Sequence, residues 1–340
     1  MPQLPPAHEL GFGKYFADQI FMARYTRQGG WVSEGVLPYQ ALKLDPAACV
    51  LHYGQALFEG LKAFRQKDGG FAIFRPEFNW KRMCDGADRL CMEAPPRELW
   101  MTGLVDLINR CVKWFPEERG TAIYIRPTLI GTEAFLGVRP SNEFLFFVIL
   151  SPVGNYYSED SGGVKIWVEK EYLRAAPGGL GATKAAANYA GSLKAAQRAK
   201  KKGYAQVLWL DHSRTAIEEV GTMNVFFRCK NEVVTPELDG SILEGGTRAA
   251  VIELLREAGH RVTERKLLIR EVIEAQQKGE LLEAFGTGTA AVITSIAELA
   301  SDDFKIQLPR ERKVTFQLFD QLSAIQRGEV RDSRGWMVRI

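Results

Sequence analysis

The sequence has no long run of apolar residues and no segment that looks like a secretory leader. Its longest apolar stretch, FLFFVIL at positions 144–150, is far shorter than the roughly 20 residues that a membrane-spanning helix requires. The first residues, MPQLPPAHELGFG, contain neither a basic nor an apolar segment, so they do not predict a secretory signal. With 46% hydrophobic and 25% charged residues, the composition is typical of a globular protein, and we expect it in the cytoplasm.

Cysteine is scarce, and charge of one sign does not accumulate. The five cysteines are odd in number and show no CxxC spacing, which argues against a disulfide framework and against a zinc site; we expect no metal. The net charge of +3 is spread along the chain and leaves no basic stripe of the kind that binds nucleic acid. A small-molecule substrate is therefore favoured, with no nucleic-acid or membrane partner.

The chain has 340 residues, more than one ordinary core accommodates, so two domains are expected. In the first half, strand-like runs alternate with helix-like runs, which predicts an α/β (α+β) fold with helices on one side of long strand pairs. A turn-rich run, SPVGNYYSEDSGG, follows at 151–163 and marks a connection. We predict a small N-terminal α/β domain over 1–157, a linker over 158–172 and a large C-terminal domain over 173–340 that carries Lys184.

Local patterns also predict individual elements. The expected strands are GLKAFR, FAIF, TAIYIRPTLI and EFLFFVIL in the first half, and VKIWVEK, QVLWL and MNVFFR in the second. The expected helices are one opened by Pro76 and others over about 99–115, 185–202, 248–258, 270–278 and 314–327, and Gly203 is expected to end the third of these six.

Lys184 and Glu219 are the first candidates for chemistry. Lys184 follows the small residues of GGLGAT at a predicted helix start, where the helix dipole opposes a cation. Glu219 lies beside Glu218 in EEVGTMN, and we expect one of these carboxylates to point inward while the other meets water. A lysine can form a Schiff base with pyridoxal 5'-phosphate, and a carboxylate can keep the pyridine nitrogen protonated. Taken alone, each residue is more often simply solvated.

Other residues could hold the rest of such a cofactor. Tyr189 could donate to the ring oxygen, although an ordinary half-buried tyrosine is the simpler interpretation. In ILEGGTRAAVIELL, Thr247 and two preceding glycines open a helix and predict a phosphate site, or else only a helix cap. The hydroxyls and amides of FGTGTAA, and the guanidinium of Arg75, are further candidates for binding the phosphate.

The strand TAIYIRPTLI places an arginine in apolar surroundings. Its alternation puts Tyr124 and Arg126 on one face and the isoleucines on the other. A cation in such a strand needs a partner. From periodicity alone, a structural ion pair and the capture of a substrate carboxylate are equally favoured.

Seven segments in this order resemble the fold type IV pyridoxal-phosphate enzymes, most closely the branched-chain amino acid aminotransferases: LHYGQALFEGLKAFR, IFRPEFNWKRM, YIRPTLIG, the Lys184–Tyr189 block, QVLWLD, EVGTMN and FGTGTAA. The resemblance covers nearly the whole chain. It implies a two-domain fold with a smaller N-terminal α+β domain and a larger C-terminal pseudo-barrel domain. It also implies transfer of the amino group of leucine, isoleucine or valine to 2-oxoglutarate, with ping-pong kinetics.

The resemblance implies a role for each matching residue. Lys184 would be the catalytic Schiff-base lysine and proton shuttle. The cofactor-binding residues would be Arg75, Lys184, Tyr189, Glu219, Thr222, Gly246, Thr247 and Thr289. The substrate-binding residues would be Phe12, Tyr53, Phe58, Tyr124, Arg126, Val153, Tyr156, Thr289 and Ala290. Members of the family are homodimers in which the loop bearing Tyr53 reaches the partner's site, and Arg126 would serve the second carboxylate of glutamate.

Two alternatives remain. Within the fold, a D-amino-acid transaminase or an aminodeoxychorismate lyase would share the cofactor residues, but the YIRP strand and the length favour neither. From another class, a non-catalytic relative could act as a binding protein. The chain departs from mammalian members, whose redox-sensitive CxxC is replaced here by AAVITS, so thiol regulation of that kind is not expected.

Overall fold

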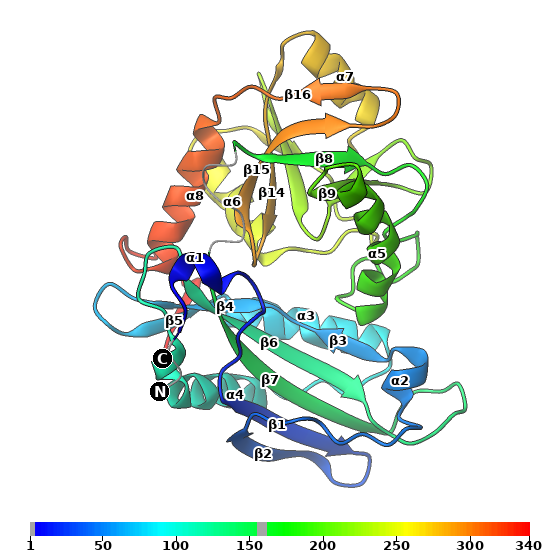
Figure 1. Cartoon of the computed structure of the whole chain (residues 1–340), viewed down its shortest axis with the longest axis vertical. Helices are drawn as coiled ribbons and strands as arrows, with labels where there is room; N and C mark the ends of the chain where they lie inside the picture. The colour runs from blue at the N-terminus through cyan, green and yellow to red at the C-terminus, as the bar shows by residue number, and fades with distance from the viewer. Residues whose placement is uncertain (1–3, 155–161) are drawn as a thin grey trace. The chain divides into compact units, whose positions relative to one another are not determined.

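The computed structural model describes residues 4–154 and 162–340, and the chain divides into two compact units (Figure 1). Unit 1 comprises Met1–Tyr156, Thr183–Ala187 and Ser323–Ile340; unit 2 comprises Tyr157–Ala182 and Asn188–Leu322. The segments 183–187 and 323–340 thus pack with the N-terminal unit, a division that local sequence patterns did not predict. No helix in the described part of the chain is both long and apolar enough to cross a membrane.

Unit 1 is built on one antiparallel sheet. Eight strands, counted within the described residues, form it in the order β17-β5-β4-β6-β7-β1-β2, with β3 paired to β6. The strands are β1 Gln19–Thr26, β2 Gly30–Pro38, β3 Ala56–Phe58, β4 Leu61–Arg65, β5 Phe71–Phe74, β6 Ala122–Gly131, β7 Glu143–Val153 and β17 Met337–Arg339. The helices are α1 Ala7–Leu10, α2 Cys49–Tyr53, α3 Pro76–Arg89, α4 Arg97–Arg110 and the 3-10 turn Val112–Trp114.

The two faces of this sheet differ in what they carry. On one face, α4 packs its buried Trp100 on Phe146 of β7, with 5.8 Å between ring centroids. Gly103 of α4 leaves room for the Phe21 ring of β1, which a Cβ atom would overlap. Because side chains alternate along β6, Tyr124 and Arg126 project from the opposite face. That face is therefore the one that holds candidate substrate residues.

Unit 2 is built on a mixed sheet. Nine strands, again within the described residues, follow the order β10-β9-β8-β15-β14-β11-β12-β13, with β16 paired to β15; β8 lies parallel to β9 and β15, and β12 to β13. The strands are β8 Val164–Val168, β9 Gln206–Leu210, β10 Ile217–Val220, β11 Asn224–Cys229, β12 Val233–Thr235, β13 Val262–Glu264, β14 Leu281–Gly288, β15 Val292–Ala300 and β16 Lys305–Gln307. The helices are α6 Gly246–Glu257, α7 Ile269–Gln277 and most of α5 Ala186–Lys201 and α8 Lys313–Gln326; the first two residues of α5 and the last four of α8 belong to unit 1.

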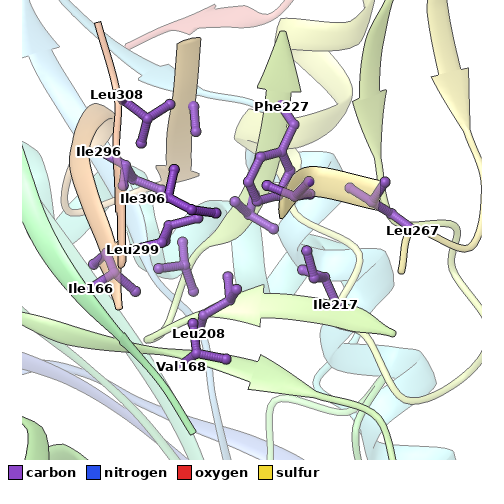
Figure 2. Packing of buried hydrophobic residues seen from close by; sticks show 14 of the residues in the cluster. Ile166, Val168, Leu208, Ile217, Phe227, Leu267, Ile296, Leu299, Ile306 and Leu308 are labelled. Carbon is purple, nitrogen blue, oxygen red and sulfur yellow. The ribbon is translucent and has the colours of Figure 1, made fainter. Parts of the chain in front are cut away.

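The core of unit 2 lies where these strands converge (Figure 2). Alternate apolar residues reach it from β8, as Ile166 and Val168, and from β11, as Val225 and Phe227. The other labelled members are Leu208, Ile217, Phe227, Leu267, Ile296, Leu299, Ile306 and Leu308. Ile217 and Val220 of β10 belong to this cluster, and their burial fixes the short strand that carries Glu219.

Most elements match their predictions. The helix predicted over 185–202 is confirmed as α5 Ala186–Lys201, and Gly203 follows it with φ at 84°, a conformation typical of a helix-ending glycine. The structure adds the β1–β2 hairpin, the C-terminal strand β17 and the strand β10, none of which was predicted.

Candidate functional site

Lys184 belongs to unit 1, although the residues on either side of its segment belong to unit 2. Its neighbour Ala185 forms a β-bridge with Leu57, and the Phe58 amide donates a hydrogen bond to the Lys184 carbonyl at 3.2 Å. The Lys184 ammonium lies 4.8 Å from the centre of the Phe58 ring. The lysine is half-buried and lies two residues before the start of α5, so two backbone contacts with β3 determine where its side chain begins.

A buried ion pair lies next to Phe58. Glu59 is only 1% exposed, and both its oxygens accept hydrogen bonds from Arg82 of α3 at 2.7 Å. Asn79 donates a third hydrogen bond at 2.7 Å. Burial alone would raise the pKa of Glu59, but the charge and hydrogen bonds of Arg82 hold it below its usual value, and Lys184 contributes in the same direction. Glu59 is therefore an anion in the surroundings of Lys184.

Aromatic rings and one cation form the face around Tyr124. The Phe12 and Tyr124 rings meet edge to face, with centroids 4.7 Å apart. The Arg126 guanidinium lies 4.6 Å from the Phe58 ring centre and donates to the Tyr124 hydroxyl at 2.9 Å. A Cβ atom at Gly60 would overlap that hydroxyl. Phe12, Phe58, Tyr124, Arg126 and Lys184, all predicted site residues, are thus brought together within unit 1.

Arg126 has no ion-pair partner among the described residues, and its Nε is buried without a hydrogen bond there. The sequence left open two roles for Arg126, a structural ion pair and the capture of a substrate carboxylate. The described residues do not form the structural ion pair. A guanidinium supported by two rings in this way retains donors for an anionic ligand.

The remaining predicted residues of unit 1 occupy different surroundings. Arg75 precedes α3 with φ at 51°, and its guanidinium lies 4.8 Å from the Phe78 ring centre. Tyr53 is exposed at the end of α2 and donates to the Leu136 carbonyl. Val153 is buried at the end of β7. Tyr156 lies outside the described residues.

In unit 2, Glu219 is buried in β10 and firmly held. The Leu243 amide donates to its Oε1 at 2.7 Å, and Arg174 Nη2 lies 2.8 Å from the same oxygen. Glu218 and Glu219 are 4% and 3% exposed. The expectation that one of the two meets water is wrong, because both sides of this strand are covered. Burial raises the pKa of Glu218, and a hydrogen bond from Ser241 only partly offsets that effect.

The predicted phosphate site begins α6. Gly246 and the buried Thr247 are the first residues of this helix, whose N-terminal amides point away from the helix body. Asn224 holds the preceding loop, because its amide donates to the Leu243 carbonyl at 2.9 Å. A Cβ atom at Gly245 would overlap Asn224 Oδ1, so this position requires glycine.

The second glycine-threonine segment ends β14. Thr287 is buried, and its hydroxyl has no hydrogen-bond partner within the described residues. Thr289 and Ala290 follow in a half-buried turn before β15. Thr222 is exposed in the turn after Glu219, and Tyr189 is half-buried in α5. Among the described residues, no three histidine, cysteine, aspartate or glutamate side chains gather as a metal site would require.

Several residues in these surroundings were not identified from the sequence. Glu59, Arg82 and Arg174 form buried ion pairs between segments distant in sequence, and no local pattern marks such pairs. Lys62 is 7% exposed and shares a sheet face with Tyr124. Its position in the predicted strand GLKAFR was a usable signal that it could lie on that face.

The fold and these residues define a class of enzyme, and comparison with known proteins gives the same result. The profile of the amino-transferase class IV family matches residues 56–299. The chain belongs to this family, and its mixed α/β architecture in two domains is the family's fold type IV.

The relatives of this chain carry the name of one kind of aminotransferase. The chain is 47% identical to branched-chain-amino-acid aminotransferase 2 of Bacillus subtilis, covering 99% of this chain and 93% of the relative. It is 45% identical to branched-chain-amino-acid transaminase 1 of the same organism, covering 99% and 96%. Among solved structures, the branched-chain amino acid aminotransferase of T.th. with pyridoxamine 5'-phosphate gives a TM-score of 0.79 at 25% identity, covering 95% and 98%. The enzyme from Escherichia coli gives 0.75 at 26% identity, covering 95% and 98%.

Proposed function

We propose that this chain is a pyridoxal-phosphate-dependent transaminase that reversibly transfers the amino group of leucine, isoleucine or valine to 2-oxoglutarate. One observation carries the proposal: Lys184 lies at the Phe58 ring, in the same unit as the aromatic face of Tyr124 and Arg126. The names of the most similar relatives support the choice of substrates.

The polar residues suit a phosphorylated pyridine. Thr247 and the amides that open α6 are suited to a phosphate, and the Thr287 hydroxyl, unpaired within the described residues, is a further donor. We assign Arg75, Gly246, Thr247 and Thr289 to the phosphate, Thr222 to its surroundings and Tyr189 to the ring oxygen. Glu219, a buried carboxylate that already accepts two hydrogen bonds, is assigned to the ring nitrogen.

When bound, the cofactor supplies an aldehyde that exchanges amino groups and a ring that accepts the electron pair released at the substrate's α-carbon. Lys184 Nζ would be the group that holds the cofactor through this aldehyde. As a free amine, Lys184 Nζ would accept the proton from the substrate's α-carbon and later release it. Glu219 would accept a hydrogen bond from the protonated ring nitrogen, and a negative charge on this carboxylate would favour that protonation.

The substrate's aliphatic group is assigned to a pocket formed by Phe12, Phe58 and Tyr124. Tyr53 of the partner subunit and Tyr156, which lies outside the described residues, are assigned to the same pocket. The amides of Thr289 and Ala290 are assigned to the α-carboxylate. Arg126 is assigned to the second carboxylate of glutamate, because an apolar pocket that also accepts a diacid needs a cation at its edge.

We also propose that the enzyme is a cytoplasmic homodimer. Large apolar side chains are exposed on α2 and on the adjoining loop, among them Leu51, Tyr53, Leu136 and Val138. The Phe135 amide donates to the Ala47 carbonyl at 3.1 Å, so α2 and this loop form one surface, and exposed apolar surfaces of this kind mark association sites. The cytoplasmic location rests on the sequence alone.

A donor panel tests the function. Purified enzyme with pyridoxal phosphate and 2-oxoglutarate should turn over L-leucine, L-isoleucine and L-valine, while D-alanine and aminodeoxychorismate should react far more slowly. Lys184→Ala should abolish repeated turnover. A preference for D-alanine or aminodeoxychorismate would assign the chain to another activity of the same fold. A protein that takes up no pyridoxal phosphate would favour the alternative of a non-catalytic relative.

A further inference from the structure

Arg174 connects three segments of unit 2 through one guanidinium. It is 10% exposed, and its Nη1 and Nη2 donate to the Gly181 carbonyl at 3.3 and 3.0 Å. Nη1 also donates to the Ser241 carbonyl at 3.1 Å, and Nη2 lies 2.8 Å from Glu219 Oε1. We propose that Arg174 is a positioning residue that keeps Glu219 ionised and aligned, so that the ring nitrogen of the cofactor stays protonated. This inference rests on the proposed function.

The two loops that Arg174 holds lead to the other candidate residues. Gly181 lies three residues before Lys184, and the Ser241 loop continues through Leu243 to the start of α6. A Cβ atom at Gly181 would overlap the Ser241 backbone, so the two loops are in direct contact. Since Leu243 donates its amide to Glu219, the same loop that accepts from Arg174 also orients the carboxylate. Arg174 thus contacts Glu219 directly and also holds the loop whose Leu243 amide donates to Glu219.

The charges around Arg174 explain why Glu219, and not its neighbour, is the anion. Three carboxyls lie near one another: Glu219 contacts Arg174, while Glu218 and Asp239 each lie 2.6 Å from the Ser241 hydroxyl. A hydroxyl has a single hydrogen, so two short contacts with carboxyl oxygens require a proton on one of the carboxyls. Burial raises the pKa of Glu218, which favours a place for this proton on Glu218. Of these carboxyls, Glu219 is therefore the one that Arg174 stabilises as an anion by direct contact.

The ring nitrogen itself is the readout. Holoenzyme loaded with cofactor labelled with ¹⁵N in the ring reports protonation by NMR, independently of turnover. In the parent protein the nitrogen should be protonated at neutral pH. In Arg174→Gln we expect it to lose its proton at a lower pH and kcat to fall about tenfold or more, with KM changing much less, since the lost interaction acts on the chemical step. Arg198→Gln, which removes an exposed ion pair with Glu171, is the control and should leave both unchanged.

A double variant separates this role from general support of the fold. In a Glu219→Gln background, Arg174→Gln should lower kcat by less than about threefold further, because both changes act through the same carboxylate. If Arg174→Gln alone does not fold, combining it with Glu218→Gln removes a neighbouring buried carboxyl together with the cation, and the same measurement applies.

The proposal is overturned if the ring nitrogen of Arg174→Gln titrates as in the parent, or if the two losses multiply in the double variant. Either result would leave Arg174 a structural residue. A parent protein that takes up no cofactor would instead contradict the proposed function, and is distinguished by the absence of any bound ¹⁵N signal.

Discussion

A lysine buried on the same face as Tyr124 is the least expected residue of unit 1. Lys62 is 7% exposed in β4, directly opposite Tyr124 of β6, and Ser151 of β7 extends the row. Burial lowers the pKa of Lys62 to about 8. An ammonium in this position destabilises the fold while it remains charged.

Replacing Lys62 should therefore stabilise the protein at neutral pH. The unfolded chain keeps its proton up to the ordinary pKa of 10.5, whereas the folded chain releases it near pH 8, so stability of the parent rises between these values. We expect Lys62→Met to raise the free energy of unfolding at pH 7 by roughly 3 kcal/mol, a gain that disappears by about pH 10.5. Denaturant titrations at several pH values measure it. Lys165→Met, at an exposed strand position, should show no such pH-dependent gain; a constant difference for Lys62→Met would show that burial of the charge is not its cause.

At the scale of single elements, α3 carries two ion pairs in very different surroundings. Glu59 and Arg82 are 1% and 11% exposed, whereas Glu77 and Arg97 are 38% and 59% exposed. Both pairs join an arginine to both oxygens of a carboxylate. Burial is thus the main difference between them.

That difference predicts unequal losses of stability. Glu59→Gln removes the carboxylate that faces the buried, charged Arg82, which should lower the free energy of unfolding by about 3 kcal/mol or more. Glu77→Gln, the matched control, should cost far less, because water solvates the released arginine. Urea unfolding of both variants tests this, and equal losses would mean that α3 does not depend on the buried pair.

The elements also show what local pattern can and cannot predict. The alternation of β6 placed Tyr124 and Arg126 on one face, and the structure confirms it, because strand periodicity is a local property. β10 was not predicted: four residues with two adjacent glutamates show no strand pattern, and its stability comes from the core of unit 2. Glu219 was chosen for its chemistry, and its burial follows only from tertiary packing.

At the scale of the whole molecule, the sequence predicted the fold family because seven short segments occur in a fixed order. It did not predict that 183–187 and 323–340 pack with the N-terminal unit, since that depends on pairings such as β17 with β5, far apart in sequence. The ion pairs of Glu59 and Glu219 were missed for the same reason. Contacts between distant segments leave no trace in local periodicity.

The most direct test of the account is a single half-reaction without an amino acceptor. Enzyme loaded with pyridoxal phosphate is mixed with L-leucine, and both the absorbance of the cofactor and the 2-oxo acid released are measured. We expect one equivalent of 4-methyl-2-oxopentanoate per active site and complete conversion of the cofactor to its amine form, with neither change in Lys184→Ala. If the cofactor binds but L-leucine yields no 2-oxo acid, the chain is not a branched-chain transaminase and the central claim is wrong.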